Sequence, residues 1–433
     1  MSSIETPPVR QSVQPAASPA PAAAPRAARA PAAATPTDGP PAPRAAAATR
    51  LIQGRPNPAM QLAPPRDDGP RGCARTPSPA DGPRRLVVSH PFDANGDRSG
   101  AFEVLNVAPN GQLSRSGRSF TLETAANSGT IDFTPDGQVG LVALDNGRIG
   151  VFRLDAEGKP TVVHEGFAGT FHAGKVVVEP RGDRALVLDR NWSHNGGGVY
   201  QVTIGCDGTL TDHGRVLAAR SPGAIAFAGD RAVVAAANVG ELDREADPGT
   251  ESVHVLEWGQ TPRRVGGADA FGHNQVVVGG AALTSDGKTF LVGDTNGFSG
   301  NLNAVAAVTL DENGARPAGG VQVDDPAAIA TSPFGQVAIV SSPLTDSLIV
   351  LDTNAQDGKW RVRGPVPHRG AAPQLPGDLA TIDRGNLRGN VYVSENVSVR
   401  RLAFRPDGSV VDLGSLQFGQ DLKDISGAIG VTK

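Results

Sequence analysis

One motif repeats along this chain, and its clearest copy reads Gly129-Thr130-Ile131-Asp132-Phe133-Thr134-Pro135-Asp136-Gly137, followed after Gln138 by Val139-Gly140-Leu141-Val142-Ala143-Leu144-Asp145. Two further runs come next, from Arg148 to Asp155 and from Pro160 to Val163. Short β-prone runs separated by turns rich in Pro, Asp and Gly are typical of antiparallel strands. The motif therefore predicts a sheet of four strands.

The motif returns at intervals of about 45 to 56 residues. Each copy opens on a small residue shortly before a turn, and the later copies open at Gly174, Gly223, Gly279, Ala327, Gly377 and Gly427. A period of this length with four strands per repeat is typical of β-propeller blades. Ankyrin, TPR and leucine-rich repeats are shorter and contain helices or single strands.

Both ends of the repeating region are incomplete. After Gly427 only Ala428 to Lys433 remain, enough for one innermost strand. The start supplies three strands without an innermost one, at 86–89, 101–107 and 118–122. Pairing of the two ends would leave no open sheet edge. We therefore predict an all-β fold, a seven-bladed β-propeller in which the C-terminal strand closes the first blade.

The predicted innermost strands carry small side chains on one face and aliphatic ones on the other. The third residue after each opening residue is Asp132, Val177, Ala226, Ala282, Ala330, Ala380 or Gly430, and the second is Ile131, Val176, Ile225, Ala281, Ile329, Leu379 or Ile429. Such alternation is the period of a strand buried between neighbouring blades.

The N-terminal region differs in composition from the rest. Residues 1–83 are rich in Ala and Pro with few large hydrophobic side chains, so they cannot offset the entropy of ordering and are predicted to be a disordered tail before a propeller at 84–433. Because Cys73 falls in this tail, far from Cys206, no structural disulfide is expected.

Charge and composition exclude several function classes. The net charge is −4 with a pI near 6.1, which argues against nucleic acid as a partner. Neither a zinc motif nor an apolar stretch long enough to span a membrane occurs, so no metal, cofactor or membrane span is expected. The first residues lack the pattern of a secretory signal, which predicts a cytoplasmic protein; a periplasmic or secreted protein is the alternative if the true start lies elsewhere. The protein is also expected to be a monomer.

The blade motif resembles that of the lactonase-type seven-bladed propellers, the family of bacterial 6-phosphogluconolactonases and the related YVTN and quinoprotein-like repeats. The resemblance rests on Phe133-Thr134-Pro135-Asp136-Gly137 with Gly150 to Gly158, and on weaker copies at 283–287 with 308–314 and at 403–408. It covers the whole repeating region. The resemblance is highly specific for the fold but not for the activity, since hydrolases and binding proteins share the same framework.

Polar residues that should gather at the mouth of the axial channel are the candidate site. Loops that lead into the innermost strand and loops that leave the second strand lie on one face of a propeller, and His172, His273 and Arg190 are the candidate catalytic residues there. The candidate ligand-binding residues are Lys175, Asp189, Asn191, Asp294, Asn296, Asp378 and Glu395. Phe171-His172-Ala173-Gly174 resembles the histidine-bearing segments of the lactonase family, although a lone histidine in a turn is more often structural.

Two other segments carry weaker signals. Asp93 to Gly100 resembles the start of a calcium loop, but Val104 stands where a bidentate Glu is needed, so a hairpin turn is the better interpretation. The acidic insertion at 240–249 is interpreted as a solvated loop in preference to a lid.

Two functions remain. The preferred one is a binding or scaffolding module whose channel mouth takes a small polar or anionic ligand or a protein. The alternative is a lactone hydrolase acting on a sugar-acid lactone, with His172 or His273 as general base and Arg190 holding the anionic group. Binding is preferred because the catalytic pattern is present only in fragments.

Overall fold

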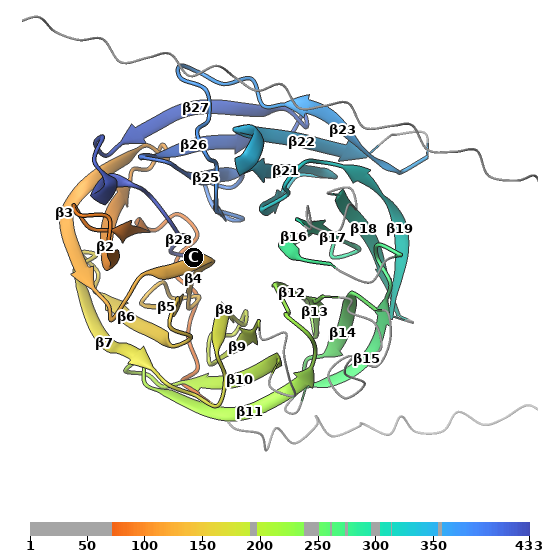
Figure 1. Ribbon diagram of the computed structural model, residues 1–433, viewed down its shortest axis with the longest axis horizontal. Helices are drawn as coiled ribbons and strands as arrows, with labels where there is room; N and C mark the ends of the chain where they lie inside the picture. Colours follow the sequence, from red (N-terminus) through yellow and green to blue (C-terminus); the bar gives the residue numbers. More distant parts are fainter. Residues whose placement is uncertain are drawn as a thin grey trace, which may run out of the picture. The chain divides into compact units, whose positions relative to one another are not determined.

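The computed structural model describes residues 72–190, 197–237, 251–259, 262–272, 276–295, 304–312, 314–353 and 357–433. These residues belong to one compact unit, 65–433, and fold into seven antiparallel sheets of four strands arranged around an axis (Figure 1). The fold is the predicted seven-bladed β-propeller. Each sheet runs from an innermost strand at the axis to an outermost strand at the rim.

The first blade combines the two chain ends: β28 (Ile429–Val431), β1 (Arg84–Phe92), β2 (Arg98–Val107) and β3 (Leu113–Thr121). Blade 2 holds β4 (Ala126–Phe133), β5 (Val139–Leu144), β6 (Ile149–Leu154) and β7 (Pro160–Phe167), and blade 3 holds β8 (Ala173–Val178), β9 (Arg184–Asp189), β10 (Gly198–Ile204) and β11 (Leu210–Ala218). Blade 4 holds β12 (Ala224–Ala228), β13 (Arg231–Ala235), β14 (Val253–Glu257) and β15 (Arg263–Ala268).

Blade 5 holds β16 (Val278–Leu283), β17 (Thr289–Asp294), β18 (Ala304–Asp311) and β19 (Gly314–Gln322). Blade 6 holds β20 (Ala328–Thr331), β21 (Val337–Ser342), β22 (Ser347–Thr353) and β23 (Trp360–Pro365), and blade 7 holds β24 (Leu379–Thr381), β25 (Asn390–Glu395), β26 (Ser398–Phe404) and β27 (Val410–Gln417). Among the described residues the helices are two single 3-10 turns, η1 (Pro343–Thr345) and η2 (Leu422–Asp424), and neither could cross a bilayer.

The ring closes as predicted, by pairing of the C-terminal strand with the first ordered strand. Leu86, Val87 and Val88 of β1 lie opposite Val431, Gly430 and Ile429 of β28 in an antiparallel register. This three-residue ladder is the seam of the ring. Because it supplies the innermost strand of blade 1, no blade is left with an exposed inner edge.

The two faces of the innermost strands pack against different neighbours, as their alternation predicted. The third residue of one blade shares an apolar cluster with the second residue of the next, in the pairs Val177 and Ile225, Ala226 and Ala281, Ala282 and Ile329, Ala330 and Leu379, and Ala380 and Ile429. At the seam, a Cβ atom on Gly430 would lie 2.6 Å from Ile131 Cγ2, so only glycine fits. Small side chains on one face therefore let the strands approach the crowded axis.

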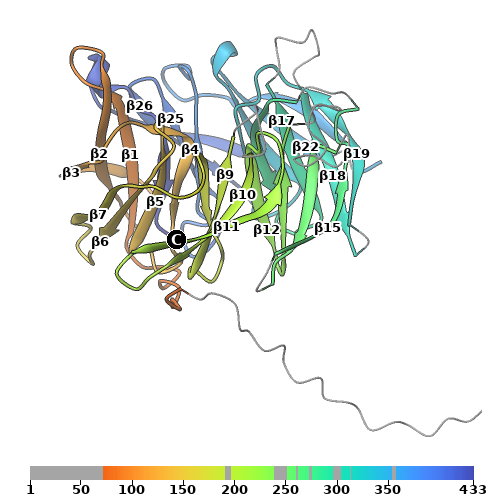
Figure 2. The ribbon, with the colours of Figure 1, turned by 60° about the horizontal axis from the view of Figure 1, so that its bottom comes forward.

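The cysteines correct one expectation. Cys73 and Cys206 form a disulfide, with Cα atoms 4.8 Å apart across 133 residues of sequence. Residues 72–83 were assigned to the tail because they lack large apolar side chains, but they lie against the ring through polar contacts instead. Figure 2 shows this segment below the ring. Residues 1–71 are outside the described part of the chain.

The two weaker sequence signals have different outcomes. Asp93 to Asp97 form the turn between β1 and β2, in which the Asp93 side chain accepts the N–H groups of Asn95 (2.8 Å) and Asp97 (2.9 Å). The hairpin interpretation is thus confirmed. The insertion at 240–249 lies outside the described residues.

Candidate functional site: the axial cavity

A cavity of about 620 Å³ occupies the axis of the ring. Its walls are the innermost strands, whose side chains are mostly small or aliphatic. Six charged side chains interrupt them: Asp132, Lys175, Arg190, Asp325, Asp378 and Lys433. A pocket of this size with a few polar groups in an apolar wall is the usual form of a small-molecule site.

Lys175 and Asp378 line the cavity where the innermost strands begin, hereafter the mouth, and both lie close to Gly129. A Cβ atom on Gly129 would lie 3.1 Å from Asp378 Oδ1 and 3.6 Å from Lys175 Nζ. The glycine has φ +63°, and its N–H donates to Asp378 Oδ2. Lys175 and Asp378 form no ion pair within 4.0 Å, so a gap remains between the ammonium and the carboxylate. The missing Cβ keeps that gap open.

Arg190 adds a second cation to the mouth. It follows β9 directly, and its Nη2 donates to the Gly223 carbonyl oxygen at 3.5 Å, a long hydrogen bond. Its Nε is buried without a hydrogen-bond partner in the described part of the protein. A guanidinium has five N–H donors, so Arg190, which lines the cavity, has donors left for a ligand.

Burial shifts the ionisation of this cluster. Burial, reinforced by the Arg190 cation, lowers the pKa of Lys175 to about 8, although Asp378 and Asp132 oppose the shift. Burial also raises the pKa of Asp378 to about 6, against the opposing effects of the Gly129 N–H and the two cations. Between these values both groups are ionised, and with Arg190 the mouth carries an excess of positive charge.

Lys433 and Asp132, which also line the cavity, form an ion pair. Lys433 Nζ lies 2.8 Å from Asp132 Oδ1. The other carboxylate oxygen of Asp132 accepts the N–H of Val178 in the neighbouring blade at 2.8 Å. Asp132 thus has its charge satisfied, whereas the described side chains offer no hydrogen bond or ion pair to the Lys175 ammonium.

Two predicted site residues, Asp189 and Asp294, hold the backbone next to the mouth. Asp189, the last residue of β9, is buried and accepts the N–H of His172 at 2.8 Å. Asp294, the last residue of β17, is buried and accepts the N–H of Val277 at 3.0 Å. In both blades the aspartate accepts a hydrogen bond from the backbone N–H of the residue two positions before the opening glycine. The His172 side chain is exposed and lies over Gly147, where a Cβ atom would approach its Nδ1 to 2.1 Å.

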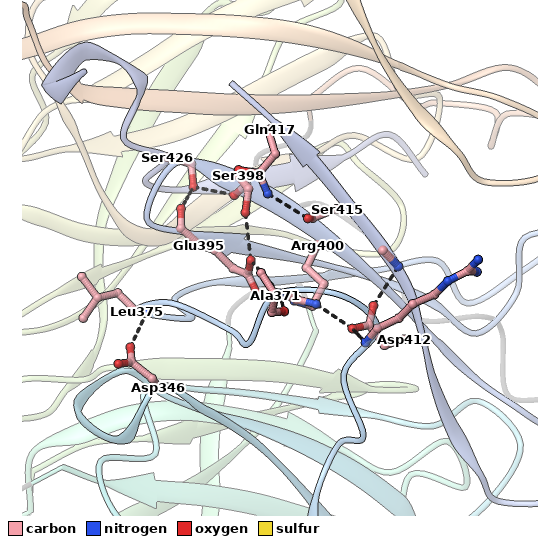
Figure 3. A network of polar contacts seen from close by, with 12 residues as sticks. Asp346, Ala371, Leu375, Glu395, Ser398, Arg400, Asp412, Ser415, Gln417 and Ser426 are labelled. Carbon is pink, nitrogen blue, oxygen red and sulfur yellow. Dashed lines mark hydrogen bonds and ion pairs between the residues drawn. The ribbon is translucent and has the colours of Figure 1, made fainter. Parts of the chain in front are cut away.

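Glu395 belongs to a buried network inside blade 7, drawn in Figure 3. Arg400 pairs with Glu395 and, at 2.6 Å, with Asp412, and its Nη2 donates to the Ala371 carbonyl oxygen at 2.9 Å. Ser398 Oγ donates to Glu395 at 2.8 Å. These groups satisfy one another within the blade, so Glu395 does not line the cavity.

The structure therefore divides the predicted site. Lys175, Arg190 and Asp378 line one cavity, whereas His172, Asp189, Asp294 and Glu395 do not. His273, Asn191 and Asn296 lie outside the described residues. The sequence analysis did not assign roles to the Gly129 N–H or to Lys433, which reaches the cavity because the chain end is the innermost strand of blade 1.

Ring and cavity together define a seven-bladed propeller with a polar axial mouth. No protein-family model and no curated protein sequence matches the chain. Solved structures match its fold. The periplasmic gluconolactonase of Pseudomonas aeruginosa is 15% identical, with a TM-score of 0.54 over 81% of this chain and 99% of that one. A candidate 6-phosphogluconolactonase from Bacteroides fragilis is 13% identical, with a TM-score of 0.53 over 83% and 100%.

A hypothetical selenium-binding protein from Sulfolobus tokodaii also matches, with a TM-score of 0.59 at 11% identity over 84% of this chain and 94% of that one. The structural neighbours thus include lactonase-type propellers, as the sequence motif implied. Identities this low concern the fold, and the site has to be judged on its own chemistry.

Proposed function

We propose that the chain is a ligand-binding propeller whose cavity mouth holds a small hydroxylated carboxylate, such as a sugar acid. The observation that carries this proposal is the gap beside Gly129, with the Lys175 ammonium on one side and the Asp378 carboxylate on the other. A ligand carboxylate would accept hydrogen bonds from Lys175 and Arg190. A neighbouring hydroxyl group would donate to Asp378.

The electrostatics support an anion over a cation. Two cations face one carboxylate, and that carboxylate already accepts the Gly129 N–H. Charge-assisted hydrogen bonds to a buried carboxylate are stronger than neutral ones, and Arg190 has unused donors. A simple cation would instead meet repulsion from both Lys175 and Arg190.

Calorimetry with a panel of aldonates at pH 7 tests the proposal. We expect binding by the parent protein and a loss of roughly tenfold or more in affinity for Lys175→Met, the scale of one lost charged hydrogen bond. Lys288→Met is the matched control, because Lys288 is exposed in the turn between β16 and β17. Equal affinity in the two variants, or no binding by the parent to any aldonate, contradicts the proposal.

Lactone hydrolysis is a second candidate, favoured by one observation. Burial raises the pKa of Asp378 to about 6, close to the neutral pH at which a general base would work, although the two neighbouring cations oppose this shift. As a carboxylate it would take a proton from water while the water oxygen attacks the lactone carbonyl. The ring oxygen would leave and take that proton back from Asp378, which gives the hydroxy acid and restores the carboxylate. Lys175 and Arg190 would stabilise the developing oxyanion.

Turnover of five- and six-membered sugar lactones distinguishes the two candidates. Hydrolysis predicts that Asp378→Asn lowers turnover by roughly 10²-fold or more. If His172 is the base, as the sequence resemblance suggests, His172→Ala lowers it by a similar factor and Asp378→Asn does less. A parent protein that binds aldonates and turns over no lactone is a binding module only.

A further inference from the structure

Residues 72–83, hereafter the strap, lie below the ring (Figure 2) and contact the turns of neighbouring blades. The strap begins at blade 3. The Cys73 N–H donates to the Ile204 carbonyl oxygen at 2.8 Å, and its sulfur is bonded to Cys206 in the turn between β10 and β11. Arg75 then reaches the Gly205 carbonyl oxygen at 2.7 Å and Asp136 of blade 2 at 2.9 Å.

The strap continues to the other side of the seam. The Ser78 N–H donates to the Pro135 carbonyl oxygen at 3.0 Å, and that oxygen also accepts Arg384 of blade 7 at 3.2 Å. Asp81 accepts the N–H of Asn386 in blade 7 at 2.6 Å. The strap thus joins blades 2 and 3 on one side of blade 1 to blade 7 on the other.

The seam that the strap spans is short, because only three residue pairs join β28 to β1. The strap also feeds directly into this seam: Arg84, which follows it, donates to the Ala80 carbonyl oxygen at 2.9 Å and to the Thr432 carbonyl oxygen at 3.3 Å. Loosening the strap therefore acts on the segment that closes the ring.

Polar contacts and one covalent bond hold the strap. It has no strand, and its residues are exposed or half-buried, apart from the Arg75 side chain, which is 3% exposed. Cys206 is exposed and Cys73 is half-buried, so a reductant can reach the disulfide in the folded protein. A segment with so little buried apolar surface belongs to the part of a structure that opens first.

We propose that the Cys73–Cys206 disulfide is a redox-controlled latch on the strap and, through it, on the seam of the ring. A dithiol reductant opens it by exchange: a thiolate attacks one sulfur, the second thiol resolves the mixed disulfide, and the reductant becomes a disulfide while Cys73 and Cys206 gain two electrons and two protons. The latched form is the state expected in an oxidising compartment.

Thiol counting and limited trypsin digestion of the full chain test the latch. We expect no titratable thiol in the oxidised protein, and two after mild reduction without denaturant. Cleavage after Arg75 should then rise about tenfold or more, because a freed strap exposes a bond that is now packed against blades 2 and 3. The mass of the fragment that begins at Thr76 reports this cleavage directly.

The double variant Cys73→Ser/Cys206→Ser is the control for the reductant itself. It should be cleaved after Arg75 at the rate of the reduced parent, with or without reductant. If it fails to fold, hydrogen exchange at the Cys73 and Ser78 amides in parent protein, before and after reduction, gives the same comparison. Two free thiols in the protein as isolated under air, or an unchanged Arg75 cleavage rate after reduction, would overturn the proposal.

Discussion

Deleting residues 427–433 should unfold the ring although it removes seven of 433 residues. The segment contains β28, the innermost strand of blade 1, and Ile429 and Val431 are 4% and 8% exposed. Burial of two such side chains contributes about 3 to 6 kcal/mol. The segment also makes four hydrogen bonds of 2.9 Å, two with Ser89 at one end and two with Arg85 at the other. Each has a net value of about 1 kcal/mol.

The expected loss is therefore about 7 to 10 kcal/mol, which is comparable to the whole stability of a typical domain. Urea unfolding followed by fluorescence or circular dichroism measures it. Deletion of Lys433 alone is the matched control: it removes a partly exposed ion pair with Asp132, worth about 1 kcal/mol at most. Ile429→Ala should fall between, with a loss of about 2 to 5 kcal/mol. An unfolding midpoint unchanged by the seven-residue deletion would refute closure through β28.

Three further predictions concern buried ionisable side chains. Burial and a hydrogen bond with Asp183 raise the pKa of Glu179 to about 7, so the folded state holds this proton more tightly than the unfolded state does. The free energy of unfolding should therefore fall as pH rises from about 4.5 to 7. Glu179→Gln should reduce this fall, as measured by melting curves at several pH values. Burial lowers the pKa of His254 to about 4, so stability should be lost as pH falls from 6.5 toward 4, and His254→Gln should reduce that acid loss. Arg400→Met leaves Glu395 and Asp412 buried without their cation and should cost about 3 to 5 kcal/mol in urea unfolding, whereas Arg263→Met, on the exposed pair with Glu257, should cost less than 1 kcal/mol.

The ring was predictable because its information is local and repeated. Each blade carries a small opening residue, a similar alternation and similar turn chemistry, so seven weak signals reinforce one another. The incomplete ends at Leu86 and Gly427 could then be paired by elimination. The strap carried no such signal, because polar contacts and a disulfide hold it in place of apolar burial. Cys73 meets Cys206 only because the ring places blade 3 beside the strap.

The site was predictable in part, for a related reason. Position within a blade identifies which residues stand near the mouth, and this brought Lys175, Arg190 and Asp378 into the prediction. Position does not tell whether a polar side chain faces the axis or turns back to its own blade. Asp189 and Asp294 turn back to cap backbone N–H groups, a choice set by hydrogen bonding in three dimensions.

The seven blades can be aligned with one another, and the alignment singles out two charged residues. The position directly after the opening residue reads Thr130, Lys175, Ala224, Gly280, Ala328, Asp378 and Ala428. Lys175 and Asp378 are thus equivalent in their blades, opposite in charge, and the only charged residues at this position. Most other blades fill it with Ala or Gly, so the fold itself does not need a charge there.

A last prediction follows from this equivalence. Lys175→Ala/Asp378→Ala should leave the free energy of unfolding within about 1 kcal/mol of the parent, or raise it, because the pair makes no close ion pair and each buried charge is costly to desolvate. The same variant should no longer bind aldonates. Urea unfolding and calorimetry on one preparation measure both quantities. A loss of stability above about 2 kcal/mol would mean that the two charges hold the ring together, and the gap at Gly129 would then be a structural contact instead of a ligand site.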